Sequence, residues 1–472
     1  MSAAVTIERG AWRTLGVTSL VGFMVSLEIT IIALALPEIR SAFPEASESM
    51  LSWVITAYNI GVASLLLVAG WLADRYGRRR IFLIGLAVFL VGSLTTGLAP
   101  SAGFLIASRV VQAIGGAMQF PSGLALLLDA FPIQRRQMAI GVWGAMGGLA
   151  AALGPSLGAL LIEAFGWRAV FLVNVPVAVF ALAAGRVWLN ESRAEGVPDS
   201  VDVVSVPLAS VGVGAMVLGI VQGDEWGWTS PATLTTFAVA VVLVAIFVRR
   251  SLHHPAPLFD LDLFKLPTYT IANIGTLFFV IAFFSWLVLL PTFVQEVWGW
   301  SVLRTGFAIA PGPMVAMLIS PVVGRLADRI GNGPILTVGG VAGAAGLLLH
   351  LALTDVTPDY VTGLLLPGLL VGVSAGCSFA MLVGAAMRDV APRRFGMAGA
   401  GRTTIFQLSI AVGIAIAVAL VGRPDSAAEA LDAMRRAWLL GTVLFAGQAV
   451  LFAVVYPPLP AAPRPAPERR PV

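Results

Sequence analysis

Apolar stretches of about 20 residues recur along the whole 472-residue chain, and each is long enough to cross a hydrocarbon core of about 30 Å as a helix. In lipid a backbone segment must satisfy its own hydrogen bonds, and an α-helix does so within one segment. With 58% hydrophobic and 11% charged residues, the chain also lies outside the composition of soluble domains. We therefore predict an all-α polytopic membrane protein.

The hydropathy pattern predicts fourteen spanning helices. The first apolar run continues to Pro37 at full spanning length, whereas a signal peptide has a shorter apolar core and a small-residue cleavage site, so we expect a retained helix. The expected spans cover residues 14–36, 51–72, 80–99, 103–128, 138–163, 168–189, 203–222, 232–249, 269–294, 304–326, 334–354, 361–384, 398–421 and 436–456.

Basic residues gather on alternate connections between these spans, as in the cluster of Arg78, Arg79 and Arg80 after the second span. Because Lys and Arg collect on the cytoplasmic side of short connections, we expect both termini in the cytoplasm and the chain in the inner (cytoplasmic) membrane. The opposite connections carry tryptophans such as Trp226 and Trp298, which are expected at the interface. The basic residues do not form one face, so no nucleic-acid partner is expected.

A weak internal repeat divides the chain into related halves. The sequence GWLADRYGRR (70–79) returns as GRLADRIGNG (324–333), each time after a span and on the expected cytoplasmic side. Internal repeats are a common way of building transporters around a midplane site. We expect an N-terminal six-helix bundle at 1–195, a central two-helix hairpin at 196–255, a C-terminal six-helix bundle at 256–456 and a proline-rich disordered tail at 457–472.

The segment 70–79 resembles the signature loop of the major facilitator superfamily, which lies between its second and third spans. Asp74 can lie at a helix N-terminus, where the helix dipole favours a carboxylate. The arginines can pair with acids on neighbouring helix ends, and Asp129 is the expected partner of Arg78. In the alternative interpretation the arginines only anchor the topology. The resemblance implies a conformational latch made of Gly70, Asp74, Arg75, Arg78, Asp129 and Asp328.

Three further segments resemble drug exporters of this superfamily. AALGPSLGALL (151–161) is similar to their span-5 antiporter motif and implies a helix pivot at Gly154, Pro155 and Gly158, although ordinary small-residue packing would use the same residues. WRAVFLVNVP (167–176) and EWGWTSP (225–231) resemble the fourteen-span drug:proton antiporter branch. The resemblance therefore covers nearly the whole chain and implies two six-helix bundles with two extra central helices.

Two membrane-embedded charges stand out in the first half. LEITIIALALP (27–37) resembles the span-1 motif of that branch, with Glu28 where aspartate is usual, and SRVVQAIGGA (108–117) resembles a span-4 motif that contains Arg109. A helical rise of about 1.5 Å per residue places Glu28 roughly 12 Å and Arg109 roughly 9 Å below the outer surface. A charge in hydrocarbon costs about 2.5–3.5 kcal/mol, so both should face the interior. Glu28 is then either a proton or cationic-substrate site, or half of a structural ion pair.

The thirteenth span departs from the family pattern. Gln407 matches, but Phe406 stands where arginine is common and Thr403 where asparagine is common. Arg402, one turn nearer the cytoplasm, either replaces the missing charge or extends to the interface. Each polar candidate for the substrate cavity has helix packing as its alternative role. The candidates are Thr56, Tyr58, Asn59, Gln112, Gln119, Asn273, Trp286, Arg402 and Gln407.

No nucleophile with a base, metal-ligand cluster or phosphate-cradling loop is evident in the spans, so neither an enzyme nor an ATP-driven pump is expected, and no cofactor. The resemblance implies a monomeric, proton-coupled antiporter that exports amphiphilic drugs or an antibiotic by alternating access, with Glu28 and Arg109 coupling the proton. One alternative is an exporter of a lipid or lipid-like metabolite. Another is a transport-inactive membrane sensor or scaffold.

Overall fold

The computed structural model describes residues 8–193, 202, 204–255, 257–421 and 426–458, and their regular elements are all helical. Twelve helical segments in this part of the chain are long and apolar enough to span a bilayer, and α1 and α5, of 34 and 30 residues, make fourteen. The spanning segments are α1 (Arg9–Ala42), α2 (Glu48–Tyr76), α3 (Arg78–Gly97), α4 (Ala102–Ala130), α5 (Arg136–Phe165), α6 with α7 (Arg168–Leu172, Asn174–Trp188), α8 (Ser205–Trp226), α9 (Pro231–His253), α10 (Pro267–Glu296), α11 with α12 (Val302–Ile309, Pro311–Ile330), α13 (Asn332–Leu353), α14 (Leu366–Met387) after the π-helical turn η3 (Val361–Leu365), α15 (Phe395–Val421), and α16 (Ala427–Val450) followed by η5 (Leu451–Val455).

Local sequence explains where several helices begin and end. Ser47 and Ser101 accept backbone hydrogen bonds at the N-termini of α2 and α4, as N-cap serines do. Gly77 and Gly331 have φ of 111° and 86°, which L side chains rarely adopt, and they end α2 and α12 at corresponding positions of the internal repeat. The first helix differs from the expectation: α1 continues through Pro37 to Ala42 instead of ending near residue 36.

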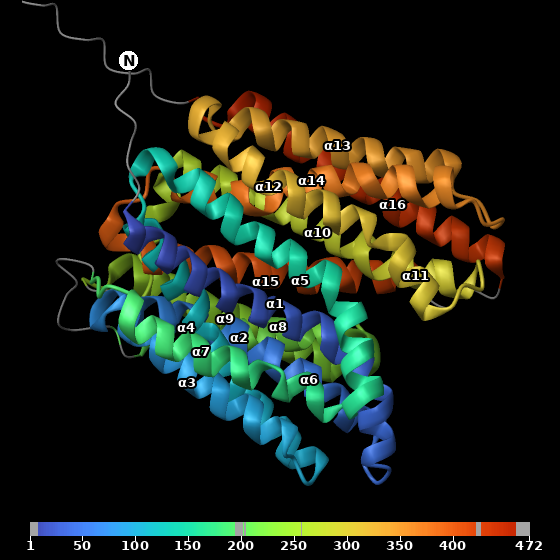
Figure 1. The fold of residues 1–472 in the computed structure, drawn as a ribbon, viewed down its shortest axis with the longest axis horizontal. Coiled ribbons are helices and arrows are strands. Elements are labelled where there is room, and N and C mark those ends of the chain that lie inside the picture. The colour runs from blue at the N-terminus through green and yellow to red at the C-terminus, as the bar shows by residue number, and fades with distance from the viewer. Residues whose placement is uncertain (1–7, 194–201, 203, 256, 422–425, 459–472) are drawn as a thin grey trace, which may run out of the picture.

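The helices form two bundles, with α1–α7 in one and α10–α16 in the other, and α8 and α9 as the extra central pair (Figure 1). The bundles contact each other through α5 on α12 and α14, and through α15 on α2 and α4. At these crossings small residues let the backbones meet, since a Cβ on Gly70 would lie 2.7 Å from the Gly396 carbonyl oxygen. A Cβ on Gly141 would lie 2.8 Å from the Ser320 carbonyl oxygen.

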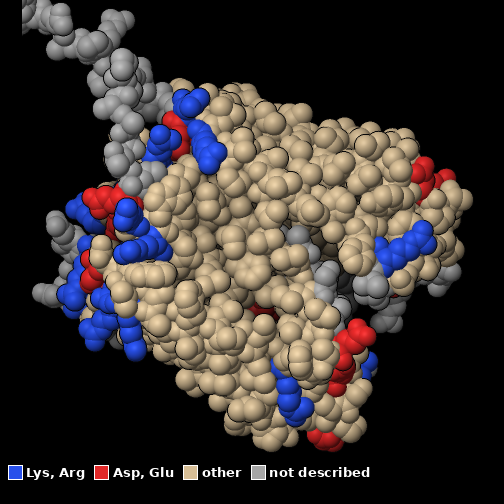
Figure 2. Space-filling model, viewed as in Figure 1, with Lys and Arg blue, Asp and Glu red and all other residues tan. Residues whose placement is uncertain are grey.

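The close contacts between the bundles lie near one end of the molecule, here named the arginine-rich end. The bundles diverge toward the opposite end (Figure 1), where the surface is hollowed between them (Figure 2). The molecule is therefore closed at the arginine-rich end. That end carries Arg75, Arg78, Arg79, Arg80, Arg135, Arg136, Arg393 and Arg394.

The central hairpin covers one of the two seams between the bundles. A Cβ on Gly214 of α8 would meet Ser64 and Ile60 of α2, so these helices approach closely. Val213 of α8 belongs to a small apolar cluster against which Leu408 of α15 also packs. The hairpin thus lies over the α2–α15 seam.

We predict that replacing Asp202 by Asn loosens this hairpin. Asp202 accepts hydrogen bonds from Arg250 Nε (2.8 Å) and Nη2 (2.7 Å) and from Ser205 Oγ (2.6 Å), which ties the start of α8 to the end of α9. The Arg250 hydrogen bonds hold the pKa of the Asp202 carboxyl well below its usual range. The stabilisation is therefore complete above the usual aspartate pKa of about 3.9 and is lost as the pH falls below it.

The measurement is the amide hydrogen-exchange protection of residues 205–226, corrected for the intrinsic exchange rate at each pH. Asp202→Asn should lower protection about tenfold at pH 7, since a hydrogen bond to a charged group contributes about 1.5–3 kcal/mol. The difference from the parent protein should shrink toward pH 3. The control is Asp262→Asn, which removes an exposed carboxylate. Equal protection of Asp202→Asn and the parent at pH 7 would contradict the prediction.

The C-terminal end of the described chain is held to α14. Arg388 donates to the carbonyl oxygen of Pro457 at 2.7 Å, and its guanidinium lies 5.0 Å from the centre of the Tyr456 ring. The expected disordered tail begins at residue 457, and its positions 459–472 lie outside the described residues.

Candidate functional site

Glu28 of α1 and Arg109 of α4 form a direct ion pair inside the first bundle. Each residue is only 1% exposed. Arg109 Nη1 donates to both the Glu28 carboxylate and Gln112 Oε1, the latter at 2.6 Å, and Nε donates to the Val54 carbonyl oxygen at 2.9 Å. The two charges that the sequence placed at similar depths are thus in contact, and each partly neutralises the other where water is excluded.

Asn174, at the start of α7, is a member of this site that the sequence analysis did not select. Its Nδ2 donates to Glu28 Oε2, so both carboxylate oxygens are occupied. The available signal was an amide side chain in the apolar run WRAVFLVNVP, where a polar group needs a partner. Gln112 extends the network, since its Nε2 donates to Ser93 Oγ at 2.8 Å.

Tyr58 of α2 closes the site on another side. The Arg109 guanidinium carbon lies 4.3 Å from the centre of the Tyr58 ring, within the range of a cation–π contact. The Tyr58 hydroxyl is buried and has no hydrogen-bond partner among the described residues. The Glu28 site therefore draws side chains from α1, α2, α3, α4 and α7, which makes its geometry sensitive to the packing of the whole bundle.

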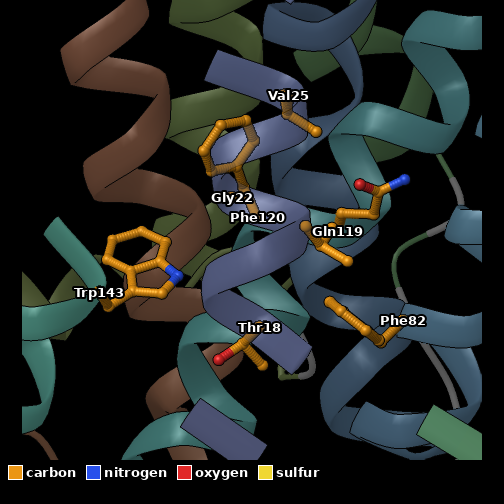
Figure 3. Close-up of a pocket in the computed structure, with 9 residues that line it drawn as sticks. Thr18, Gly22, Val25, Phe82, Gln119, Phe120 and Trp143 are labelled. Carbon is orange, nitrogen blue, oxygen red and sulfur yellow. The ribbon is translucent and has the colours of Figure 1, made fainter. Parts of the chain in front are cut away.

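Gln119 lines a cavity between α1, α3, α4 and α5 (Figure 3). Its Nε2 donates to the Gly85 carbonyl oxygen at 3.3 Å, while its Oε1 has no partner among the described residues. Phe120 and Trp143 flank the same cavity (Figure 3). The cavity lies about one to three helical turns from Glu28 along α1, toward the arginine-rich end.

The other cavity candidates do not join the Glu28 site through any contact seen in the described part of the chain. Asn273 donates to the Tyr269 carbonyl oxygen within its own helix, and Trp286 Nε1 donates to His350 Nε2 at 3.2 Å. Trp286 also lines a small pocket with Leu290 and Ile309, and the cavity role of both residues stays a prediction. Thr56 is buried, and Asn59 and Gln407 are half-buried.

Trp298 and Trp300, two tryptophans expected at the membrane interface, lie on the connection before α11. Both are buried, because their rings pack on each other at 5.2 Å and Trp298 Nε1 donates to the Asp355 carbonyl oxygen. These two aromatic residues thus pack within the end of the second bundle, and their depth in the membrane stays a prediction.

Arg402 lies on α15 in the second bundle and is 7% exposed. Its guanidinium carbon is 5.9 Å from the centre of the Phe406 ring, one turn farther from the arginine-rich end. Arg402 is thus buried in the described structure, and both interpretations offered by the sequence stay predictions.

Asp74 connects the two bundles at the arginine-rich end. Its Oδ1 accepts from the backbone N–H of Gly396 (3.1 Å) and its Oδ2 from that of Met397 (2.8 Å), the first residues of α15. A carboxylate at this position is favoured by the positive end of the helix dipole. Asp74 also accepts from Arg78, which forms an ion pair with Asp129, as expected.

The repeated motif makes the corresponding contact in the opposite direction. Asp328 of α12 accepts from the backbone N–H of Gln137 at 3.2 Å, at the start of α5. Each bundle thus contributes one aspartate that caps a helix of the other bundle. Arg75 contacts the rings of Trp71 and Tyr76 beside this crossing.

The pivot candidates Gly154 and Gly158 are buried in the second half of α5. The side-chain surroundings of Pro155 lie outside the described part of the structure. The role of these residues stays a prediction.

Glu191 is an acid at the arginine-rich end that the sequence analysis did not select. Its two carboxylate oxygens accept from the backbone N–H groups of Arg79 and Arg80, each at 3.1 Å, and so cap the N-terminus of α3. From the sequence, Glu191 is an acid that follows the sixth span. The helix that it caps could not be predicted.

Known proteins support the class that this fold and site define. A family model described as the Major Facilitator Superfamily matches residues 18–414. The proton:xylose symporter XylE, in a solved structure bound to a sugar derivative, superimposes with a TM-score of 0.67 over 96% of this chain and 97% of its own, at 14% identity. This is a likeness of fold alone.

Two relatives specify the branch. The multidrug resistance protein Stp of Mycobacterium tuberculosis (strain CDC 1551 / Oshkosh) is 36% identical over 414 residues, which is 87% of this chain and 75% of Stp. The multidrug efflux pump LfrA of Mycolicibacterium smegmatis is 32% identical over 408 residues, or 86% of this chain and 80% of LfrA. The chain belongs to the major facilitator superfamily, and within it is related to drug-resistance efflux proteins of the fourteen-span branch.

Proposed function

We propose that this chain is a proton-coupled antiporter that exports amphiphilic drugs or an antibiotic by alternating access, with Glu28 as its protonation site. The observation that carries the proposal is the buried pair of Glu28 and Arg109, placed inside a bundle of a transporter fold. The similarity to proteins named for multidrug resistance and efflux supports the substrate class.

Protonation of Glu28 removes the charge partner of Arg109. The guanidinium then keeps only the neutral acceptors Gln112 and Val54. Losing one partner of a buried ion pair typically costs about 3–5 kcal/mol, so the proton is taken up most readily when the surroundings of the pair change at the same time. Rocking of the bundles supplies such a change, which links the protonation of Glu28 to the exposure of the cavity.

In this proposal the arginine-rich end faces the cytoplasm and both termini lie on that side of the inner membrane, because Lys and Arg favour cytoplasmic connections. The structure then corresponds to a state closed to the cytoplasm by Asp74 and Asp328. Glu28 exchanges protons with the outside in this state and with the cytoplasm after the bundles rock. A proton that enters replaces the substrate that leaves.

The test uses everted membrane vesicles that contain the full chain and a panel of fluorescent dyes, cationic and anionic. A pH gradient that is acidic inside the vesicle should drive dye accumulation. Dye added outside without a gradient should cause the release of protons from the vesicle interior. Vesicles from cells with an empty vector are the control. A fluorescent phospholipid in the panel tests the lipid-exporter alternative. Dye movement that ignores the pH gradient would overturn the proton coupling.

A further inference from the structure

Arg402 is a buried cation for which the described residues supply no counter-charge. It is 7% exposed, its Nε has no hydrogen-bond partner, and it forms no ion pair with any residue that the structure describes. Three acids of the arginine-rich end already have partners: Asp74 and Asp129 pair with Arg78, and Asp260 pairs with Arg394. A buried unpaired charge is costly, so such a residue is retained where something else supplies the opposite charge.

The side of α15 that carries Arg402 begins at a contact with the first bundle. Gly399, three residues before Arg402, approaches Pro121 and Leu124 of α4. Residues at i, i+3 and i+7 share one side of a helix, so Arg402 and Phe406 lie on this same side. Arg402 therefore follows a contact with the first bundle, while Phe406 on the same side of α15 packs on α10 and α14 of the second bundle.

Arg402 on α15 and the Glu28 site inside the first bundle lie at different levels along the bundle axis. Gly399 of α15 approaches Pro121 of α4, so these two residues mark one common level. Along α4, Arg109 lies about three turns from Pro121, roughly 18 Å. Along α15, Arg402 lies about one turn from Gly399, roughly 4.5 Å. Because α4 and α15 run in opposite directions, both arginines lie on the same side of this level, away from the arginine-rich end. The difference between the two distances separates Arg109 from Arg402 by roughly 13 Å along the bundle axis. A ligand at Arg402 would lie between Glu28 and the closed arginine-rich end.

Aromatic side chains extend from Arg402 toward the centre of the molecule. Phe406 packs edge-on against Phe284 of α10 at 6.2 Å and against Phe379 of α14 at 6.2 Å, and Phe379 contacts Phe283 at 5.1 Å. Phe284, Phe379 and Phe406 are each half-buried. These rings form an apolar wall beside the guanidinium, which matches a molecule with an aromatic body and one charged end.

We propose that Arg402 and the phenylalanines 284, 379 and 406 form a binding subsite for the anionic group of an aromatic amphiphile, such as a carboxylate, sulfonate or phosphate. The guanidinium offers a planar set of donors suited to such oxygens, and the rings hold the apolar part. The inference names a substrate class and so rests on the proposed transport function. An anionic lipid headgroup would present the same chemistry.

The experiment measures binding of radiolabelled 1-naphthoate to the full chain in phosphatidylcholine nanodiscs, with the neutral 1-naphthalenemethanol as the matched ligand. Arg402→Gln should weaken naphthoate binding about tenfold or more while the neutral ligand binds as before, since only the charge-assisted hydrogen bonds are lost. Arg402→Lys should retain part of the affinity. Arg393→Gln, an exposed arginine at the same end, should change nothing.

Two further readouts separate the sources of the anion and the possible failures. Phosphatidylglycerol in the nanodiscs, with bound lipid counted by native mass spectrometry, identifies a headgroup if it competes with naphthoate only when Arg402 is present. Unchanged naphthoate affinity in a folded Arg402→Gln protein, or an equal loss of both ligands, would overturn the proposal. Naphthoate binding that depends on Arg402, without proton-driven dye transport, would keep the subsite and reject the transport function.

Discussion

Replacing Glu28 by Gln is expected to abolish proton-driven dye exchange in everted vesicles. Glutamine preserves the size of the side chain and one acceptor for Arg109, but it carries neither the charge nor a transferable proton. The exchange rate should fall to that of empty vesicles, while dye equilibration without a gradient continues. Glu28→Asp keeps the carboxylate on a shorter side chain and should retain exchange.

Stability must be followed in the same variants, because Arg109 loses its charge partner in Glu28→Gln. The cost of an unpaired buried charge, about 3–5 kcal/mol, is large enough to lower the melting temperature. Glu163→Gln, an exposed acid at the opposite end of α5, is the matched control for the substitution itself. Proton-driven exchange at the parental rate in folded Glu28→Gln would reject Glu28 as the protonation site.

The second large effect is expected at the closed end of the molecule. Asp74→Asn removes the charge that faces the N-terminus of α15 and weakens the hydrogen bonds from Gly396 and Met397. Hydrogen bonds to charged groups contribute about 1.5–3 kcal/mol, and the ratio of open to closed molecules should rise tenfold or more. Asp328→Asn, at the matching contact with α5, should act in the same direction.

The opening can be measured as a distance between spin labels at Arg80→Cys and Arg393→Cys, which lie on different bundles at the arginine-rich end and are both exposed in the parent. Cys377 is the single native cysteine and is replaced by Ala in this background. Asp262→Asn again serves as the exposed control. A distance distribution that stays the same in Asp74→Asn would show that this capping contact does not hold the end closed.

Much of the fold was predictable, because spanning length and apolar composition are local properties of a segment. The fourteen spans and the repeat of the aspartate motif follow from the sequence, and the pairing of Arg78 with Asp129 is present as predicted. The predicted end of the first helix, near residue 36, was wrong. Pro37 lacks an N–H donor, but a proline is tolerated inside a membrane helix, and α1 continues to Ala42. The burial of Trp298 and Trp300 was not predictable, because an aromatic ring at a helix end can face lipid or protein, and only packing selects between them.

The sequence by itself determined that this is a polytopic helical membrane protein with two related halves and with charges at Glu28 and Arg109 that must face inward, since the cost of exposing a charge to lipid acts on each residue separately. Only the tertiary structure decided which groups meet. Asn174 completes the Glu28 site from 146 positions away, and Asp74 caps a helix whose first residues follow it by more than 300 positions. It also buried Arg402 without an ion pair to any described residue. Such contacts depend on how helix ends are brought together by the packing of two bundles, which no local pattern specifies.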